Sequence, residues 1–289
     1  MKNSKRPLWL GENPSSDYKS IIDASINRAL AGVSPIFVNN WNSKWEGVGT
    51  GFVVTFGGQA YFVTANHVIA AAFTQKQVAA KIFGKWVFLH GLYFVDNLKS
   101  DISVTFLPPR WLESYGISEI FAPMLEPLPA TYTGTSTFMM VGYPASKNKF
   151  DLRWPSDMTT KPIAIEAKLD DRRFAPTNIE PSIHIHYDHK AFPIRLPALQ
   201  GMSGGPLFEV MSREIGARRG LSLCPRGVLC EWHKRQRVVV AASIDSVAKT
   251  IEDRSIVWKL AETSHARGAP TLLTPPDTQP PNPDDYLAQ

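Results

Sequence analysis

Cysteine is scarce in this chain of 289 residues, and long apolar runs are missing. Cys224 and Cys230 are the two cysteines, which is few for a secreted protein of this size and favours the cytoplasm or another reducing location. The basic opening Met1 to Arg6 is not followed by the apolar segment of a secretory signal. No run approaches the ~20 apolar residues that cross a bilayer. We therefore expect a cytoplasmic protein with no contact to the membrane.

A large excess of charge of one sign is also absent. The net charge of +5 and the isoelectric point near 9.1 are mild, and they do not by themselves indicate a nucleic-acid partner. With 44% apolar and 20% charged residues, the composition is that of a globular protein that can bury a core. The length suggests about two domains, and we find no internal repeat.

The segment Gly201 to Pro206, with the sequence Gly-Met-Ser-Gly-Gly-Pro, is the most informative stretch. Three glycines and a proline disfavour both helix and strand, so we expect a tight, exposed turn before a strand at 207–210. Such a turn can present the Ser203 hydroxyl beside backbone N–H groups, which acyl transfer requires. The structural alternative is a glycine-rich hairpin whose serine bonds the local backbone.

A nucleophilic serine needs a base, and the base needs a carboxylate that orients it. The apolar strand that begins at Tyr61 delivers His67 as it ends, and Asp101 opens a second alternating strand. Asp96, five positions earlier, is an alternative carboxylate. We prefer Asp101 because it directly precedes a strand that can hold a buried carboxylate.

The order His67, Asp101, Ser203 resembles that of the chymotrypsin-like (trypsin-like) serine peptidases, as in a bacterial-type intracellular member. Thr-Ala-Asn-His-Val at 64–68 is similar to the family's Thr-Ala-Ala-His-Cys, and Asp-Ile-Ser-Val at 101–104 resembles its Asp-Ile-Ala-Leu. Gly-Met-Ser-Gly-Gly-Pro resembles its Gly-Asp-Ser-Gly-Gly-Pro. Together these motifs cover roughly residues 33 to 250.

The resemblance implies a serine endopeptidase. Ser203 would attack the scissile carbonyl, His67 would transfer the proton, and Asp101 would orient the imidazole. The N–H groups of Gly201 and Ser203 would form the oxyanion hole. A protein or peptide substrate is expected, without a cofactor, metal ion or nucleic acid, and a regulatory partner stays open. The alternative function is a binding module that keeps the fold without its chemistry.

The resemblance also implies where a substrate side chain is selected. Trypsin-like members carry a carboxylate six positions before the nucleophile, where this chain has Pro197, with Gln200 close by. We therefore expect a small or apolar residue before the scissile bond, unless the nearby Asp245 changes this. In the family a late apolar strand, here 238–244, lines the pocket. The expected substrate contacts on it are Ala242, Ser243 and Ile244, with Ser243 considered first for the substrate backbone.

Met202 occupies the position of an aspartate that, in secreted members, receives a new N-terminal ammonium after propeptide cleavage. A methionine cannot pair with that ammonium, and the unpaired buried charge would cost several kcal/mol. We therefore expect apolar packing of Met202 to order the turn, without proteolytic maturation of the N-terminus.

The predicted fold is all-β, with two antiparallel chymotrypsin-like barrels packed face to face around an active-site cleft. Short strands separated by turn signals, such as Gly57-Gly58, indicate a barrel or sandwich, and the resemblance selects the barrel. The expected parts are a helical N-terminal extension (1–32), a first barrel with His67 and Asp101 (33–118), a second barrel with Ser203 (119–266) and a disordered proline-rich tail (267–289). The extension contains an amphipathic helix at 16–31, which could pack on the domain or dock into a partner.

Three further features each allow a second interpretation. Cys224 and Cys230 could form a disulfide, or supply zinc ligands together with His233. His184, His186 and His189 could chelate a metal, although a solvated strand face explains their alternation. The arginine-rich insertion at 211–237 is expected to be a solvated surface loop, with an acidic partner or nucleic acid as alternatives.

Overall fold

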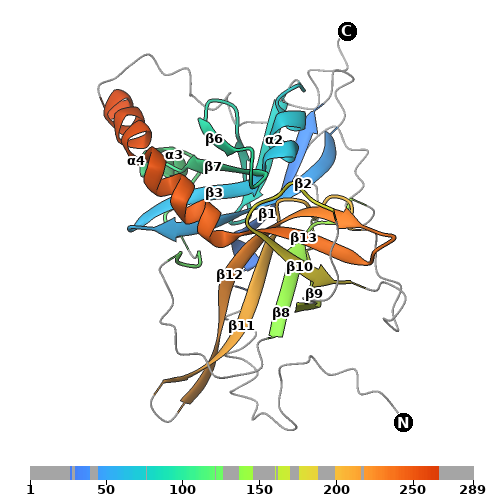
Figure 1. Cartoon of the computed structure of the whole chain (residues 1–289). Helices are drawn as coiled ribbons and strands as arrows, with labels where there is room; N and C mark the ends of the chain where they lie inside the picture. Colours follow the sequence, from blue (N-terminus) through green and yellow to red (C-terminus); the bar gives the residue numbers. More distant parts are fainter. Residues whose placement is uncertain are drawn as a thin grey trace, which may run out of the picture.

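The computed structural model describes residues 27, 30–39, 45–75, 77–120, 122–125, 137–145, 160, 162–169, 176–187, 199–215 and 218–266. Within these ranges the chain is mostly β, with two antiparallel sheets and few helices (Figure 1). The N-terminal helix predicted at 16–31 lies largely outside the described residues, as do the predicted tail, Pro197 and His189. The predicted domain boundaries stay predictions.

The first sheet is open and has seven strands in the order β5-β4-β1-β2-β3-β7-β6. The predicted Gly57-Gly58 turn joins β2 and β3, and both glycines have the positive φ (56° and 76°) that a two-residue hairpin turn of this kind requires. Its strands are β1 (Val33–Asn39), β2 (Trp45–Phe56), β3 (Gln59–Ala65), β4 (Gln77–Ile82), β5 (Lys85–Phe88), β6 (Phe94–Asn97) and β7 (Ile102–Phe106).

The second sheet has six strands in the order β10-β13-β12-β11-β8-β9. This order returns on itself through β9 and β10, which pair at only two positions. The expectation of two barrels is thus confirmed only as two antiparallel sheets, because the first sheet is open. The strands are β8 (Thr137–Gly142), β9 (Ile163–Leu169), β10 (Ser182–His186), β11 (Pro206–Ile215), β12 (Arg218–His233) and β13 (Val238–Ser243).

One hydrophobic core is shared by both sheets. Phe62 of β3 and Val104 of β7 belong to the same buried cluster as Phe208 of β11 and Val240 of β13. A smaller cluster around Met140 and Leu207 fills the second sheet alone. The shared core holds the ends of β3 and β11 in one place, which positions the candidate site.

The helices with described bounds are α2 (Asn66–Ala72), α3 (Pro109–Ser114) and α4 (Ile244–Ala266). The long α4 follows β13 and extends alongside the first sheet (Figure 1). There the Trp258 and Tyr61 ring centroids lie 5.2 Å apart, and Asn97 Nδ2 donates to Thr250 Oγ1 at 3.3 Å. Within the described residues, no helix has both the length and the apolar composition that crossing a bilayer needs.

The interpretation of 211–237 as an insertion loop is wrong. Most of this region is strand, because β11 and β12 pair from Pro206↔Val228 to Ile215↔Arg218. The hairpin continues beyond its neighbours, since β8 pairs with β11 only to Val210 (Figure 1). Its arginines therefore lie on a two-stranded ribbon whose backbone groups pair with each other.

The disulfide alternative is also wrong. Neither Cys224 nor Cys230 forms a disulfide, and both thiols are buried. The two residues lie six positions apart on β12, which corresponds to about 20 Å of strand against the ~6 Å that a disulfide spans. Among the described residues, no group of three His, Cys, Asp or Glu side chains could hold a metal ion.

Candidate active site

His67 and Asp101 lie at the N-terminus of α2, where β3 ends. The cap residue Ala65 offers no side-chain oxygen to the first N–H groups of the helix. Asp101 supplies the acceptors instead: its backbone oxygen accepts from Asn66 N–H at 2.9 Å, and its Oδ1 accepts from His67 N–H at 3.0 Å. Its Oδ2 lies 2.7 Å from His67 Nδ1. One aspartate therefore fixes both the backbone and the ring of His67.

The structure brings Asp101, and not Asp96, to His67. Asp96 Oδ1 accepts from Ser103 Oγ at 2.5 Å, on the neighbouring strand. Asp101 has a φ of +49°, which is uncommon for a residue with a side chain and costs about 1 to 2 kcal/mol. The turn is held by Ser100, whose hydroxyl donates to Glu180 O at 2.7 Å. This strained turn aims the carboxylate at α2.

The turn that carries Ser203 is bound to both sheets. Ser203 O accepts from Thr50 N–H of β2 at 2.8 Å, and Gly204 N–H donates to Leu229 O of β12 at 2.6 Å. A Cβ on Gly204 would overlap Thr50 O and Thr64 Oγ1 and approach Ala65 N, so the backbone of the turn lies against the end of β3. This is the strand that leads into His67.

Two N–H groups of the turn have no backbone acceptor among the described residues, those of Gly201 and Ser203. The N–H groups between and after them are used: Met202 donates to Leu199 O, and Gly205 donates to Met202 O. Gly201 has a φ of +89°, and a Cβ there would press on Tyr143 O and Ala145 N. The glycine is therefore required by both conformation and space.

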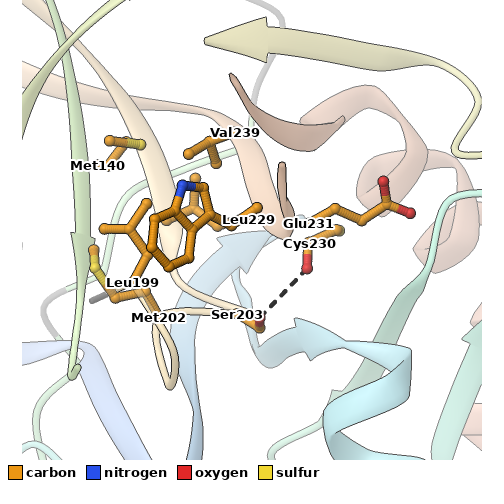
Figure 2. Close-up of a pocket in the computed structure, with 9 residues that line it drawn as sticks. Met140, Leu199, Met202, Ser203, Leu229, Cys230, Glu231 and Val239 are labelled. Atoms are coloured by element: carbon orange, nitrogen blue, oxygen red, sulfur yellow. Dashed lines mark hydrogen bonds between the residues drawn. The ribbon is translucent and has the colours of Figure 1, made fainter. Parts of the chain in front are cut away.

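The hydroxyl of Ser203 donates to the carbonyl oxygen of Cys230 at 3.3 Å (Figure 2). Among the hydrogen bonds of the described residues, none joins Ser203 Oγ to His67. Cys230 is the extra residue of a β-bulge, because Leu229 pairs with Ala241 while Glu231 pairs with Val240. The bulge explains how this carbonyl comes to face the serine.

The thiol of Cys230 lies on the Asp101 side of the site. Sγ lies 3.2 Å from Val228 O and 3.6 Å from Asp101 O. Burial raises the pKa of the Cys230 thiol, and the negative charges of Asp101 and Glu231 raise it further. The thiol therefore stays neutral. Sequence reasoning considered Cys230 only as a disulfide or zinc ligand and missed this position.

A small pocket that is partly open to solvent lies beside Ser203 (Figure 2). Ser203, Cys230 and Glu231 line one part of it, and the rest is apolar. The Glu231 side chain points away from the apolar part, and its Oε2 lies 2.8 Å from His233 Nε2. The apolar lining consists of Met140, Leu199, Met202, Leu229, Trp232 and Val239.

The residues expected to line the pocket on the late strand do not line it. Ala242, Ser243 and Ile244 are absent from its wall; the late strand contributes Val239, and β12 contributes Leu229 to Trp232. Ser243 N–H donates to Pro181 O at 3.0 Å, and its hydroxyl lies 3.4 Å from Asp245 Oδ2.

Around the turn itself, Gln200 is exposed, and its carbonyl accepts from Ala145 N–H at 2.7 Å. Met202 is 2% exposed and belongs to the apolar cluster of the second sheet, the packing that its sequence context predicts. That cluster also includes Leu199, two residues before Gly201.

No protein-family model matches the sequence, and no curated protein matches it. Among solved structures, the chain is similar to an HtrA-type protease, AlgWS227A with tripeptide, at a TM-score of 0.46 and 14% identity. The match covers 80% of this chain and 62% of that one, so the chain spans less than two thirds of the protease.

A second similar structure comes from work on the coupled folding and binding of the intrinsically disordered Sesbania mosaic virus VPg protein. It has a TM-score of 0.43 and 14% identity, and the match covers 75% of this chain and 88% of that one. Both are distant likenesses of fold, and they assign neither an activity nor catalytic residues.

Proposed function

We propose that this chain is a serine endopeptidase whose two sheets form a chymotrypsin-like pair of β domains around the site. The observation that carries the proposal is the double hydrogen bond of Asp101 to the ring and the backbone of His67, at 2.7 and 3.0 Å. This pair of hydrogen bonds lies at the end of β3, against which the backbone of the Ser203 turn packs. A structural histidine needs no such arrangement beside a serine turn in which the N–H groups of Gly201 and Ser203 have no backbone acceptor among the described residues.

In the proposed mechanism Asp101 sets the tautomer of His67. Because Oδ2 is an acceptor, Nδ1 carries the proton and Nε2 keeps its lone pair. Nε2 then removes the proton of Ser203 Oγ while Oγ attacks the scissile carbonyl carbon. The carboxylate stabilises the imidazolium that forms, and the imidazolium returns the proton to the leaving amine. Water hydrolyses the acyl-enzyme by the reverse sequence.

The charge that develops on the carbonyl oxygen needs donors. The N–H groups of Gly201 and Ser203 would supply them, because neither has a backbone acceptor among the described residues. The packing of Met202 in the apolar cluster supports a preformed turn that needs no new N-terminus.

Catalysis also requires Ser203 Oγ to leave the carbonyl of Cys230. A rotation about χ1 between staggered positions can redirect the hydroxyl towards His67. The hydrogen bond that is given up is 3.3 Å long and therefore weak, so substrate binding can favour the reactive position at little cost.

The proposed substrates are peptides with a small or apolar residue before the scissile bond. The wall of the pocket is apolar where Met140, Leu199 and Val239 meet, and Trp232 occupies part of the space. Burial of a charged side chain there would leave it without a partner, which is costly.

One observation favours the second candidate, a catalytically silent binding module. The Ser203 hydroxyl bonds Cys230 O and not His67, so the triad is not aligned in this conformation. If the Ser203 hydroxyl cannot turn away from Cys230 O, the pocket binds peptides without cleaving them.

A fluorophosphonate probe that labels activated serines separates the two candidates. Wild-type protein should become labelled, and Ser203→Ala should not. Folded wild-type protein that resists the probe would favour the binding module.

The carboxylates provide a matched pair for the same assay. Asp101→Asn should slow labelling by about 10³- to 10⁴-fold, because the amide can present its NH₂ to Nδ1 and so favour the wrong tautomer of His67. Asp96→Asn should label at close to the wild-type rate, since Asp96 bonds Ser103 instead. The reverse result would mean that the base has been assigned the wrong partner.

A further inference from the structure

Glu231 is the acidic residue in the wall of the pocket, next to Ser203 and Cys230, and most of the remaining wall is apolar. It directly follows Cys230, whose carbonyl oxygen accepts a hydrogen bond from Ser203 Oγ. Ser203 and Glu231 line the same part of the pocket. Its side chain is 36% exposed. In Figure 2 the carboxylate points away from the cluster of Met140, Leu199 and Met202. The acid therefore faces solvent beside the pocket, outside its apolar part.

His233 holds this carboxylate in place. The two residues alternate on β12, so their side chains share one face of the strand, and Nε2 lies 2.8 Å from Oε2. A carboxylate offers about four acceptor positions, and the histidine uses one of them. Among the described residues no other hydrogen bond uses this carboxylate, which leaves acceptor positions for a donor on a ligand.

A second negative charge acts at the same end of the site. The charges of Asp101 and Glu231 both contribute to the raised pKa of the Cys230 thiol. Two carboxylates that influence one thiol lie close together on the scale of charge interactions in a protein. Two carboxylates, those of Asp101 and Glu231, therefore lie near the Cys230 thiol, although the whole chain carries a net charge of +5.

We propose that Glu231 is a specificity-determining residue, which selects peptides with a lysine or arginine near the scissile bond but outside the apolar pocket. The proposal rests on the proposed function for the place of the peptide. The residue directly before the scissile bond enters the apolar pocket, and a neighbouring residue carries the cation to Glu231.

The test uses binding, so that it does not depend on turnover. The peptides are alanine pentapeptides with blocked ends and a neutral fluorophore. Each peptide has one alanine replaced by lysine, glutamine or glutamate, and all five positions are tested. Their affinities for full-length Ser203→Ala protein are measured by fluorescence anisotropy. At one position or more the lysine peptide should bind about fivefold tighter than the glutamine peptide, and the glutamate peptide should bind more weakly. Added salt should reduce the difference.

The variants assign the preference to one residue. Glu231→Gln keeps the shape and should abolish the lysine preference, whereas Glu231→Lys should reverse it. Glu252→Gln makes the same change of net charge at an exposed position of α4 and should leave the preference intact.

Three results would overturn the inference: equal binding of the three peptides, a lysine preference that survives Glu231→Gln, or no binding of any peptide up to about 1 mM. If a Glu231 variant fails to fold, equal binding of the three peptides to Ser203→Ala still refutes the inference. Labelling of wild-type Ser203 by the fluorophosphonate reports the proposed function separately. Labelling without charge selection would refute only the role of Glu231.

Discussion

At Gly204 the backbone of the serine turn lies so close to β2 and β3 that no side chain fits. A Cβ there would overlap Thr50 O and Thr64 Oγ1, and both atoms belong to paired strands that cannot move independently. The φ of +85° adds a conformational demand that glycine alone meets readily. The serine turn can lie against the end of β3 because this residue has no side chain.

Gly204→Ala should therefore lower the free energy of unfolding by more than the strain of a left-handed alanine alone would. We expect a loss of about 3 kcal/mol or more, since overlap with backbone is added to about 1 kcal/mol of strain. Gly58→Ala is the matched control, because its φ is +76° and a Cβ would meet nothing within 4 Å. Urea unfolding measures both. Equal losses would show that the turn can move away from the strands.

The residues of the site differ in how well sequence could predict them. The contact between His67 and Asp101 was predictable, because each lies in a short motif at the end of a strand. Cys230 and Glu231 acquire their places from a bulge in β12, and a shift of one residue reverses the face on which a side chain lies. A local sequence pattern does not show the pairing register between strands, so the expected contacts fell on Ala242 to Ile244, whereas Leu229 to Trp232 of β12 and Val239 of β13 line the pocket.

At the scale of elements, α4 is the segment that joins the end of the second sheet to the first. Trp258 is 3% exposed and packs edge-on against Tyr61 of β3, with 5.2 Å between ring centroids. Ser246 and Thr250 bond the turn between β6 and β7, through Ser100 Oγ at 3.1 Å and Asn97 Nδ2 at 3.3 Å. The helix thus supports the turn that carries Asp101.

Trp258→Ala should lower the free energy of unfolding by about 3 to 5 kcal/mol, because a large buried ring is lost and a cavity remains. Chemical denaturation measures the loss. Glu252→Ala on the exposed side of the same helix should change stability by less than about 0.5 kcal/mol. A small effect of Trp258→Ala would mean that α4 contributes little to the first sheet.

Elements were harder to predict where charge obscures the pattern. The arginines of 211–237 suggested a solvated loop, yet β11 and β12 pair over ten positions in that region and before it. The two strands satisfy each other's backbone groups, so their pairing does not depend on the charge of the side chains. The signal for α4 was present, because buried Val247, Ile251 and Trp258 follow helical spacing. The Gly57-Gly58 hairpin, in contrast, is encoded by two adjacent residues.

At the scale of the whole molecule, Tyr143 links the two sheets. It follows β8, and its hydroxyl donates to Val33 O at the start of β1, at 3.1 Å. Burial raises the pKa of Tyr143 from 10.0 to about 12. The folded state therefore prefers the neutral phenol, while the unfolded chain ionises near pH 10.

The stability of the protein should accordingly fall as the pH rises above 10. The contribution of Tyr143 is fully present below its unfolded pKa of 10.0, and up to about 3 kcal/mol is lost as the pH approaches 12. Tyr143→Phe should cost about 1 kcal/mol at neutral pH and show a shallower alkaline decline. Denaturant unfolding from pH 9 to 11.5 tests this, with the 63% exposed Tyr93→Phe as control. Identical declines in all three proteins would refute the assignment.

The hydrogen bond between the hydroxyls of Ser100 and Ser246 spans 146 residues of sequence. During synthesis at about 5 to 20 residues per second, the partner of the Asp101 turn is therefore made roughly 7 to 30 s after the turn itself. Until then the strained aspartate lacks its support from α4. A nascent chain would thus carry its histidine, its aspartate and later its serine without a fully supported site, and the proposed peptidase would acquire its activity only once the ribosome has passed α4.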